Sequence, residues 1–183
     1  MNRLSLKIAL VLIASSSTAQ ASVLVVGGGL AESCYRAADA RDKSHDALQI
    51  CNRALLGEPL TREDRVATYV NRGILHFARG APVEATKDFD RALALDPNEP
   101  DAWLNKAVVL VQYDKNVEAL PLIERALLLN TRRPALAYYV RGIIEEERGN
   151  IRAAYDDFRR AQSLEPRWKQ PAIELARYQV RGG

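Results

Sequence analysis

Three neighbouring residues have the side chains of a nucleophilic catalytic triad. They are Ser44, His45 and Asp46, which would supply a nucleophile, a base and an orienting carboxylate. Adjacent residues on a helix point in different directions, so these three side chains cannot meet. Glu145-Glu146-Glu147 could hold an acid/base pair, but such a run is more typical of a solvated helix end. The local spacing therefore does not predict a catalytic site.

The sequence also lacks the residue spacing of a metal site or a cofactor-binding site. No group of histidines and carboxylates has the spacing of a zinc site. Gly27 and Gly29 follow an apolar stretch, as in a dinucleotide-binding turn, but Glu32 stands where that turn needs its third glycine. We therefore expect no cofactor, no metal and no enzyme. A site assembled from distant residues is the remote alternative.

The first 21 residues have the composition of a cleaved secretory signal. Arg3 and Lys7 supply the positive start, residues 8–14 form an apolar run, and Ala19-Gln20-Ala21 fits the small-x-small cleavage pattern. An uncleaved membrane anchor is the alternative, but the apolar run is much shorter than the roughly 20 residues that span a bilayer. We expect a periplasmic product that begins at Ser22 and is not inserted in a membrane.

Composition indicates one substantial domain with little net charge. The chain has 183 residues, of which 48% are hydrophobic. Removing the predicted signal leaves 24 basic and 23 acidic residues. Such a balance provides no electrostatic footprint for nucleic acid, so we expect no nucleic-acid partner.

Any functional residues must be positioned by a repeat of about 34 residues. Equivalent alanines, aromatic residues, glycines and prolines recur at offsets of 34, 35 or 69 along the chain. The repeat-defining residues are Gly73, Ala85, Phe89, Ala92, Pro97, Trp103, Ala119, Ala126, Gly142, Ala154, Phe158, Ala161 and Pro166.

Residues 69–97 form the most regular copy, and they predict two amphipathic helices joined at Gly80. Glycine adopts a positive φ at low cost, which suits the residue after a helix end. Gly73 and Ala85 lack bulk, so the two helices can approach closely. One hairpin cannot bury its apolar face alone, and neighbouring copies must stack.

This period and these residues resemble the tetratricopeptide repeat, here of an exported bacterial type. The resemblance implies an all-α fold, a right-handed α-α solenoid of about four helix-turn-helix units with a C-terminal capping helix. Residues 22–29 would form a flexible apolar and glycine-rich lead-in, and residues 30–181 the single repeat domain. The predicted units span residues 30–59, 66–99, 100–134 and 135–168, and the capping helix spans residues 170–181.

The first unit diverges from the others and contains the two cysteines of the chain. Aligning its second helix with that of the next unit places four extra residues in the loop after Pro59, around residues 60–64. Either Tyr35 or Cys34 occupies the position of the family's glycine. Cys34 and Cys51 lie on opposite helices at inward-facing positions, which in an exported protein predicts a disulfide. Two buried free thiols are the alternative.

The third unit breaks the pattern at Pro121, inside its predicted second helix. Proline cannot donate to the carbonyl four residues earlier, so this helix should either begin late, near Val117, or bend. His76 stands where the family usually has an aromatic residue, so we expect it to pack.

The resemblance implies that the first helix of each unit lines a concave groove. The groove positions of the second to fourth units are Val70, Asn71, Ile74, Phe77, Leu104, Asn105, Val108, Val111, Tyr139, Val140, Ile143 and Glu146. Asn71 and Asn105 occupy equivalent positions, and an amide can both donate to and accept from a peptide backbone. Apolar residues at Val70, Ile74, Leu136 and Val140 argue against the carboxylate clamp of the family's chaperone-binding members. Burial between units is the alternative explanation for these apolar residues.

The sequence thus predicts a non-catalytic scaffold of the cell envelope that binds protein or peptide through its concave face. A structural or accessory subunit, acting by self-association or through its outer and terminal surfaces, is the alternative. The identity of the partner and the oligomeric state lie beyond the sequence.

Overall fold

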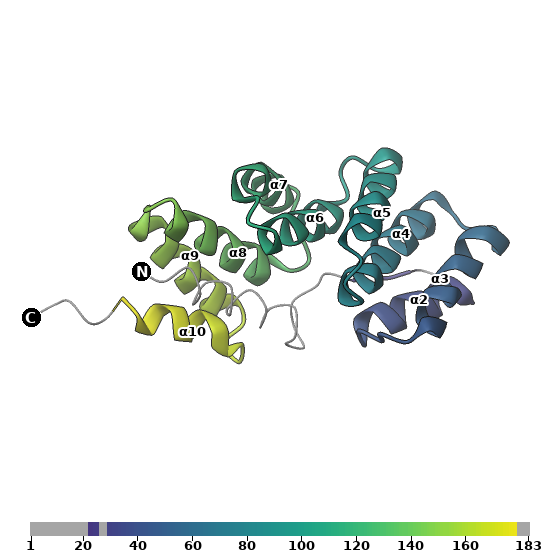
Figure 1. The fold of residues 1–183 in the computed structure, drawn as a ribbon, viewed down its shortest axis with the longest axis horizontal. Helices are drawn as coiled ribbons and strands as arrows, with labels where there is room; N and C mark the ends of the chain where they lie inside the picture. Colours follow the sequence, from purple (N-terminus) through teal and green to yellow (C-terminus); the bar gives the residue numbers. More distant parts are fainter. Residues whose placement is uncertain (1–21, 26–28, 179–183) are drawn as a thin grey trace, which may run out of the picture.

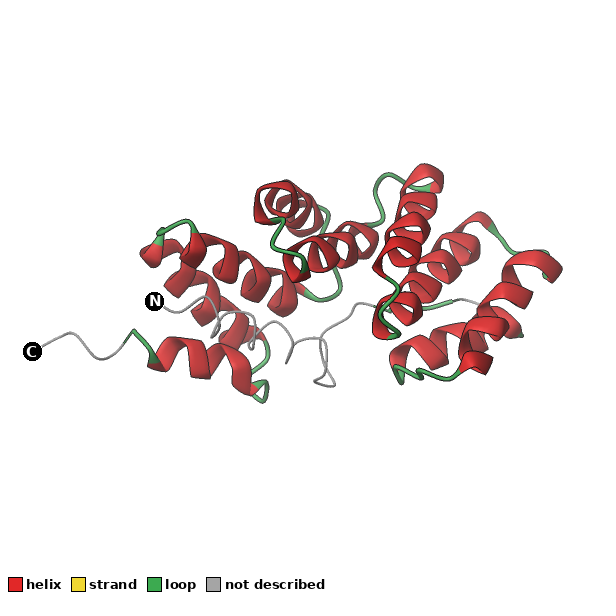
Figure 2. Ribbon diagram, viewed as in Figure 1, coloured by secondary structure: helices red, strands yellow, loops and turns green. Residues whose placement is uncertain are grey.

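The described part of the chain, residues 22–25 and 29–178, forms an elongated stack of antiparallel helix pairs in a computed structural model (Figures 1 and 2). The predicted signal, residues 1–21, lies outside the described residues. The helices are α2 (Leu30–Asp39), α3 (His45–Gly57), α4 (Arg62–Ala78), α5 (Pro82–Leu95), α6 (Pro100–Gln112), α7 (Asn116–Leu128), α8 (Pro134–Glu147), α9 (Ile151–Leu164) and α10 (Lys169–Ala176).

The four predicted units are present as consecutive hairpins: α2–α3, α4–α5, α6–α7 and α8–α9. Each hairpin packs on the next, and α10 packs against α9 at the C-terminal end of the stack (Figure 1). The described residues contain no strand. The predicted all-α solenoid is confirmed.

A residue with positive φ follows the first helix of every unit. Gly80 (φ 78°) and Gly149 (φ 82°) occupy this position after α4 and α8. Arg41 (φ 52°) and Asp114 (φ 60°) adopt the same backbone conformation after α2 and α6, although residues other than glycine rarely do so. The turn geometry is therefore shared by all four units, while only two of them use glycine.

Close helix contact within the second and fourth units depends on glycine. A Cβ added to Gly73 would lie 2.5 Å from the Phe89 ring, and one added to Gly142 would lie 2.8 Å from the Phe158 ring. Both phenylalanines are fully buried. In each unit the phenylalanine ring of the second helix thus fills the space beside the glycine of the first helix, where any larger side chain would clash.

Two element boundaries differ from the sequence prediction. The four extra residues near position 60 were expected in a loop, but α4 already begins at Arg62. Thr61 caps this helix: its side-chain oxygen accepts from the Asp64 N–H at 3.0 Å, and Asp64 and Glu63 lie in the first turn, where negative charge is stabilised. At the other end, α10 stops at Ala176, within the predicted capping helix of residues 170–181, and residues 179–181 lie outside the description.

Pro121 lies inside α7, which begins at Asn116. The proline stands in the second turn of the helix, where it costs the hydrogen bond that would reach the Val117 carbonyl. Because α7 begins only five residues before Pro121, the missing hydrogen bond lies near the N-terminus of the helix. Of the two alternatives for this unit, the structure favours a helix that begins just before Val117 and continues through the proline.

The buried apolar residues form two clusters that meet at α6. One cluster joins the first two units with residues 23 and 25, and the other joins the last two units with Trp168 beyond them. Phe77 and Trp103 contact both clusters. The hydrophobic core is therefore nearly continuous along the stack.

Candidate functional site

The inner face of the second unit holds a short extended segment of the chain itself. The Val23 N–H donates to Asn71 Oδ1 at 2.8 Å, and Asn71 Nδ2 donates to the Val23 carbonyl at 2.8 Å. Both amide atoms of one side chain therefore bind both main-chain groups of one residue. This is the peptide-gripping geometry expected of an asparagine at this groove position.

The segment is packed in place, which corrects the prediction of a flexible lead-in for residues 22–25. Val23 and Val25 are 6% and 4% exposed, whereas Leu24 between them is 61% exposed. The Ser22 hydroxyl donates to Asp39 Oδ1 at 3.0 Å. Burial of two valines and pairing of the backbone order a stretch whose composition alone suggests mobility. The neighbouring residues 26–28 lie outside the described part of the chain.

Most predicted groove residues are buried where the helices meet. Val70, Ile74, Leu104, Val111, Tyr139, Val140 and Ile143 are at most 3% exposed, and Val108 is 7% exposed. Asn105 is also buried, at the position equivalent to Asn71. Phe77, in contrast, is partly exposed and lies between the two core clusters.

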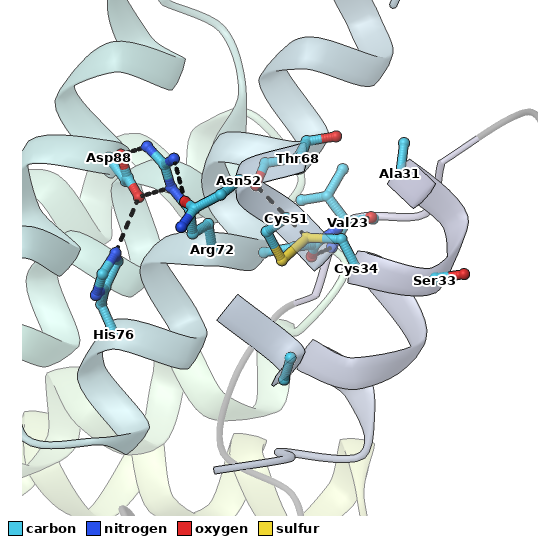
Figure 3. The surroundings of a disulfide bond; sticks show 12 residues. Val23, Ala31, Ser33, Cys34, Cys51, Asn52, Thr68, Arg72, His76 and Asp88 are labelled. Carbon is cyan, nitrogen blue, oxygen red and sulfur yellow. Dashed lines mark hydrogen bonds and ion pairs between the residues drawn. A yellow bond between two sulfur atoms is a disulfide. The ribbon is translucent and has the colours of Figure 1, made fainter. Parts of the chain in front are cut away.

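A disulfide joins Cys34 of α2 to Cys51 of α3, in the pairing that the sequence predicts (Figure 3). Both cysteines are fully buried. Cys51 is the counterpart of Phe89, which contacts Gly73, so the bond places Cys34 rather than Tyr35 at the position of the family's glycine. The turn after α2 therefore holds one extra residue. Closing this loop of 17 residues stabilises the fold by about 3 kcal/mol in the loop-entropy model.

An ion pair that the sequence analysis did not identify links the two helices of the second unit. Arg72 donates through Nε and Nη2 to the Asp88 carboxylate, each at 2.7 Å, and through Nη1 to Asn52 at 2.8 Å (Figure 3). Asp88 is 1% exposed, so the pair is desolvated and bidentate. Because Asn52 belongs to α3, Arg72 also connects the first unit to the second.

The same pair recurs 69 residues later in the fourth unit. Arg141 donates to Asp157 at 2.7 and 2.6 Å, and this hydrogen bonding raises the pKa of the Arg141 guanidinium. In both units the arginine also lies over the ring of the tyrosine three residues earlier, Tyr69 or Tyr138. The offset of 69 was the signal in the sequence that could have revealed these pairs.

Two buried acidic residues, Glu99 and Asp101, lie at the start of α6 and contact the loop between α7 and α8. Arg132 contacts Asp101 Oδ2 at 2.8 Å and Glu99 Oε1 at 3.1 Å, and Thr131 donates to Asp101. Burial raises the pKa of the Asp101 carboxyl, while the hydrogen bond from Thr131 and the charge of Arg132 oppose that shift. Burial likewise raises the pKa of Glu99. This arrangement fixes the loop before α8 rather than forming an open site.

The groove position at Glu146 is closed by the C-terminal segment. Arg177 Nη2 and the Tyr178 hydroxyl each donate to Glu146 Oε1 at 2.8 Å, and Arg177 also contacts Glu174. Tyr139 is buried beneath the same segment, with its ring centroid 4.7 Å from that of Trp168. Burial raises the pKa of both the Tyr139 and the Tyr178 hydroxyl. In the fourth unit, the groove residues Tyr139 and Glu146 are therefore covered by the C-terminal segment at the end of the stack.

The remaining candidates for chemistry have structural contacts. Ser44 caps α3 by accepting from the Ala47 N–H at 3.2 Å, while His45 is exposed beside Gln49. His76 lies 3.8 Å from Asp88, and burial lowers its pKa. Among residues 22–25 and 29–178, no group of three or more histidines, cysteines or carboxylates is placed to hold a metal ion. Within the same ranges, no helix is both long and apolar enough to cross a bilayer.

Comparison with known proteins supports the repeat. Residues 76–141 match the tetratricopeptide repeat. A stretch of 92 residues is 34% identical to the human Protein O-mannosyl-transferase TMTC3, and it covers 50% of this chain but 10% of that protein. The chain therefore spans about a tenth of the length of this relative.

Solved structures share the fold. The first tetratricopeptide-repeat domain of human RPAP3 superposes with a TM-score of 0.56 at 25% identity, over 62% of this chain and 88% of that one. MamA superposes with a TM-score of 0.61 at 19% identity, over 82% of both chains. A double mutant of MamA RS-1 superposes with a TM-score of 0.64 at 23% identity, over 85% of this chain and 86% of that one. The architecture is thus a helical solenoid of tetratricopeptide-repeat type, a fold that generally mediates protein–protein interaction.

Proposed function

We propose that this chain is a non-catalytic scaffold of the cell envelope, located in the periplasm, that binds an extended segment of a partner protein in its concave face. The observation that carries the proposal is the pair of hydrogen bonds between the Asn71 amide and the main chain of Val23. Main-chain pairing of this kind does not depend on the identity of the bound side chain. The inner face can therefore hold a peptide in an extended conformation.

The predicted signal in residues 1–21 supports export, and the Cys34–Cys51 disulfide suits an oxidising compartment. Mass spectrometry of the chain purified from an envelope fraction tests this part of the proposal. We expect Ser22 to be the first residue and both cysteines to be oxidised. An unprocessed chain with two free thiols would contradict it.

Site-specific photo-crosslinking in the native envelope tests the binding face. A photoreactive residue at Phe77, which is partly exposed on α4, should capture a discrete partner. The matched control is Val117, 89% exposed on the second helix of the third unit, which should not capture the same protein. Substituting Asn71 and Asn105 with alanine should reduce the yield at Phe77. Identical partners and yields at both positions, with or without these asparagines, would rule out the concave face.

One observation favours the accessory-subunit alternative. Leu56, Val117 and Leu128 lie on second helices, and each is at least 71% exposed. Exposed apolar side chains on the outer helices could support self-association. Light scattering over a range of concentrations tests this possibility, and a constant monomer mass would exclude it.

A further inference from the structure

The segment held by Asn71 has the side-chain alternation of a bound strand. Successive side chains of an extended chain point to opposite sides. Val23 and Val25 are accordingly buried, while Leu24 points away and is 61% exposed. The site therefore buries the side chains of Val23 and Val25 and leaves that of Leu24 exposed to solvent.

The surface beneath the segment is apolar and belongs to the first two units. Val23 and Val25 lie in the same buried cluster as Ala38, Val70 and Ile74. The disulfide belongs to this cluster as well, and Figure 3 shows Val23 beside it. Short β-branched residues have few rotamers to lose on burial against such a surface. While Asn71 pairs with any main chain, the two buried positions select the side chains.

The segment can leave without unfolding the helix that follows it. The first turn of α2 is capped by the residue that follows α3: Glu58 accepts the Leu30 N–H at 2.7 Å and the Ala31 N–H at 3.1 Å. The Cys34–Cys51 bond fastens α2 to α3. Neither contact involves residues 22–25. The start of α2 is thus stabilised independently of the segment in the groove.

We propose that the second unit recognises an extended partner segment with β-branched apolar residues at alternate positions, and that residues 22–25 are an internal copy that this segment displaces. The inference rests on the proposed function, because it names the kind of partner that the concave face binds. One amide can pair with one main chain at a time, so the internal segment and the partner compete for Asn71.

Peptide binding to the full chain tests the competition. The probe is a fluorescent peptide, Ser-Val-Leu-Val-Gly-Gly-Gly, labelled at its last glycine. In the variant with Val23→Asp and Val25→Asp, both buried valines become charged, and the internal segment should vacate the groove. We expect this variant to bind the probe at least tenfold more tightly than the wild-type chain does, by fluorescence anisotropy.

Matched controls separate recognition from general loosening. Leu24→Asp adds one charge at the exposed position and should leave probe affinity at the wild-type level. Adding Asn71→Ala to the Val23→Asp, Val25→Asp variant should abolish binding. A probe with aspartate in place of leucine should still bind, whereas one with aspartate in place of both valines should not. Equal probe affinities of the wild-type chain, the Val23→Asp, Val25→Asp variant and its Asn71→Ala derivative would overturn the proposal.

Hydrogen exchange of the unmodified chain provides a test that does not depend on a variant folding. The Val23 amide is protected by Asn71, so excess probe should accelerate its exchange while the amides of α2 stay protected. Unchanged exchange at saturating probe would refute displacement. If a partner crosslinks at Phe77 but the probe neither binds nor changes exchange, this inference fails alone. If the probe behaves as expected but no partner is captured, the proposed function fails.

Discussion

The second and third units place the same two helix positions in contact but fill them differently. In the second unit, Gly73 leaves room for the Phe89 ring, which a Cβ would approach to 2.5 Å. In the third, Ala107 stands opposite Ile123, and both are fully buried. The larger residue on the first helix is matched by a smaller one on the second. The repeat therefore conserves the shared volume of the pair rather than either residue.

The charged residues of these units differ in the same coupled way. The second unit buries Asp88 and pairs it with Arg72 through two hydrogen bonds. The third has Lys106 in place of the arginine and Leu122 in place of the buried carboxylate, and its lysine contacts Asp90 of α5 in the second unit, which is 52% exposed. A buried carboxylate thus accompanies a bidentate arginine, and an exposed carboxylate accompanies a lysine. The cation thus matches the burial of its partner in each pair, and five predictions test how far such matching extends.

The largest difference is expected between the two ion pairs. Asp88→Ala leaves the Arg72 guanidinium without its buried partner and should lower the free energy of unfolding by about 3 to 5 kcal/mol. Asp90→Ala removes an exposed partner and should cost less than about 1 kcal/mol. Urea titrations followed by circular dichroism measure both. Similar losses would show that burial of the carboxylate does not distinguish the two ion pairs.

The first unit extends the comparison, because a covalent bond replaces the packed pair. Substituting Cys34→Ala and Cys51→Ile introduces the residues of the third unit. Loss of the crosslink should still reduce stability by about 3 kcal/mol, since the disulfide restricts the unfolded chain. Chemical reduction of the wild-type chain should cause a similar loss. A variant as stable as the oxidised chain would show that packing alone suffices.

Gly73→Ala places a methyl group against the Phe89 ring. Overpacking costs about 1 to 3 kcal/mol, and the higher helix propensity of alanine returns about 1 kcal/mol. We therefore expect a net loss of up to about 2 kcal/mol in chemical denaturation. Gly142→Ala in the fourth unit should act in the same direction.

The double variant Gly73→Ala, Phe89→Ile copies the third unit and measures the coupling. Its loss of stability should be smaller than the sum of the two single losses by about 1 kcal/mol, because the alanine and the isoleucine share the space. Strict additivity would contradict the view that the two positions form one packing unit.

The smallest effect is expected at His76, whose counterpart in the third unit is Leu110. Burial lowers the pKa of His76, although the Asp88 carboxylate opposes this shift. The native state then favours the neutral ring, so its contribution to stability is complete above the unfolded pKa of about 6.5 and is lost as pH falls through the lower native pKa. His76→Leu should weaken the decline in stability below about pH 6.5. Urea midpoints between pH 5 and 7.5 measure the difference, and parallel profiles would contradict it.

Local spacing allowed most of the fold to be predicted. Small residues at fixed offsets require two helices to approach closely within each unit, and unpaired apolar faces require the units to stack. The inward positions of Cys34 and Cys51 followed from the same register. Element ends were less predictable: Thr61 caps α4 earlier than the repeat alignment suggests, because a side-chain hydrogen bond outweighs the alignment at that point.

The groove shows where prediction from sequence stops. The sequence indicated that Asn71 could hold a peptide backbone, because an amide donates and accepts. It did not indicate which backbone, since Val23 lies 48 residues earlier and belongs to a stretch whose composition suggests a mobile linker. Burial of most other groove positions was one of two alternatives from the sequence, and the choice between them depends on how neighbouring units pack.

The sequence by itself determined the repeat, the hairpins and the chemical capacity of their inner faces, because these depend on residue types at short, regular separations. Only the tertiary structure decided that residues 22–25 occupy the inner face, that Glu58 caps α2 across the first unit, and that Arg177 and Tyr178 close the last one. Each of these contacts joins residues 28 to 48 positions apart outside the repeat register, and such pairings arise only once the stacked helices bring the residues together.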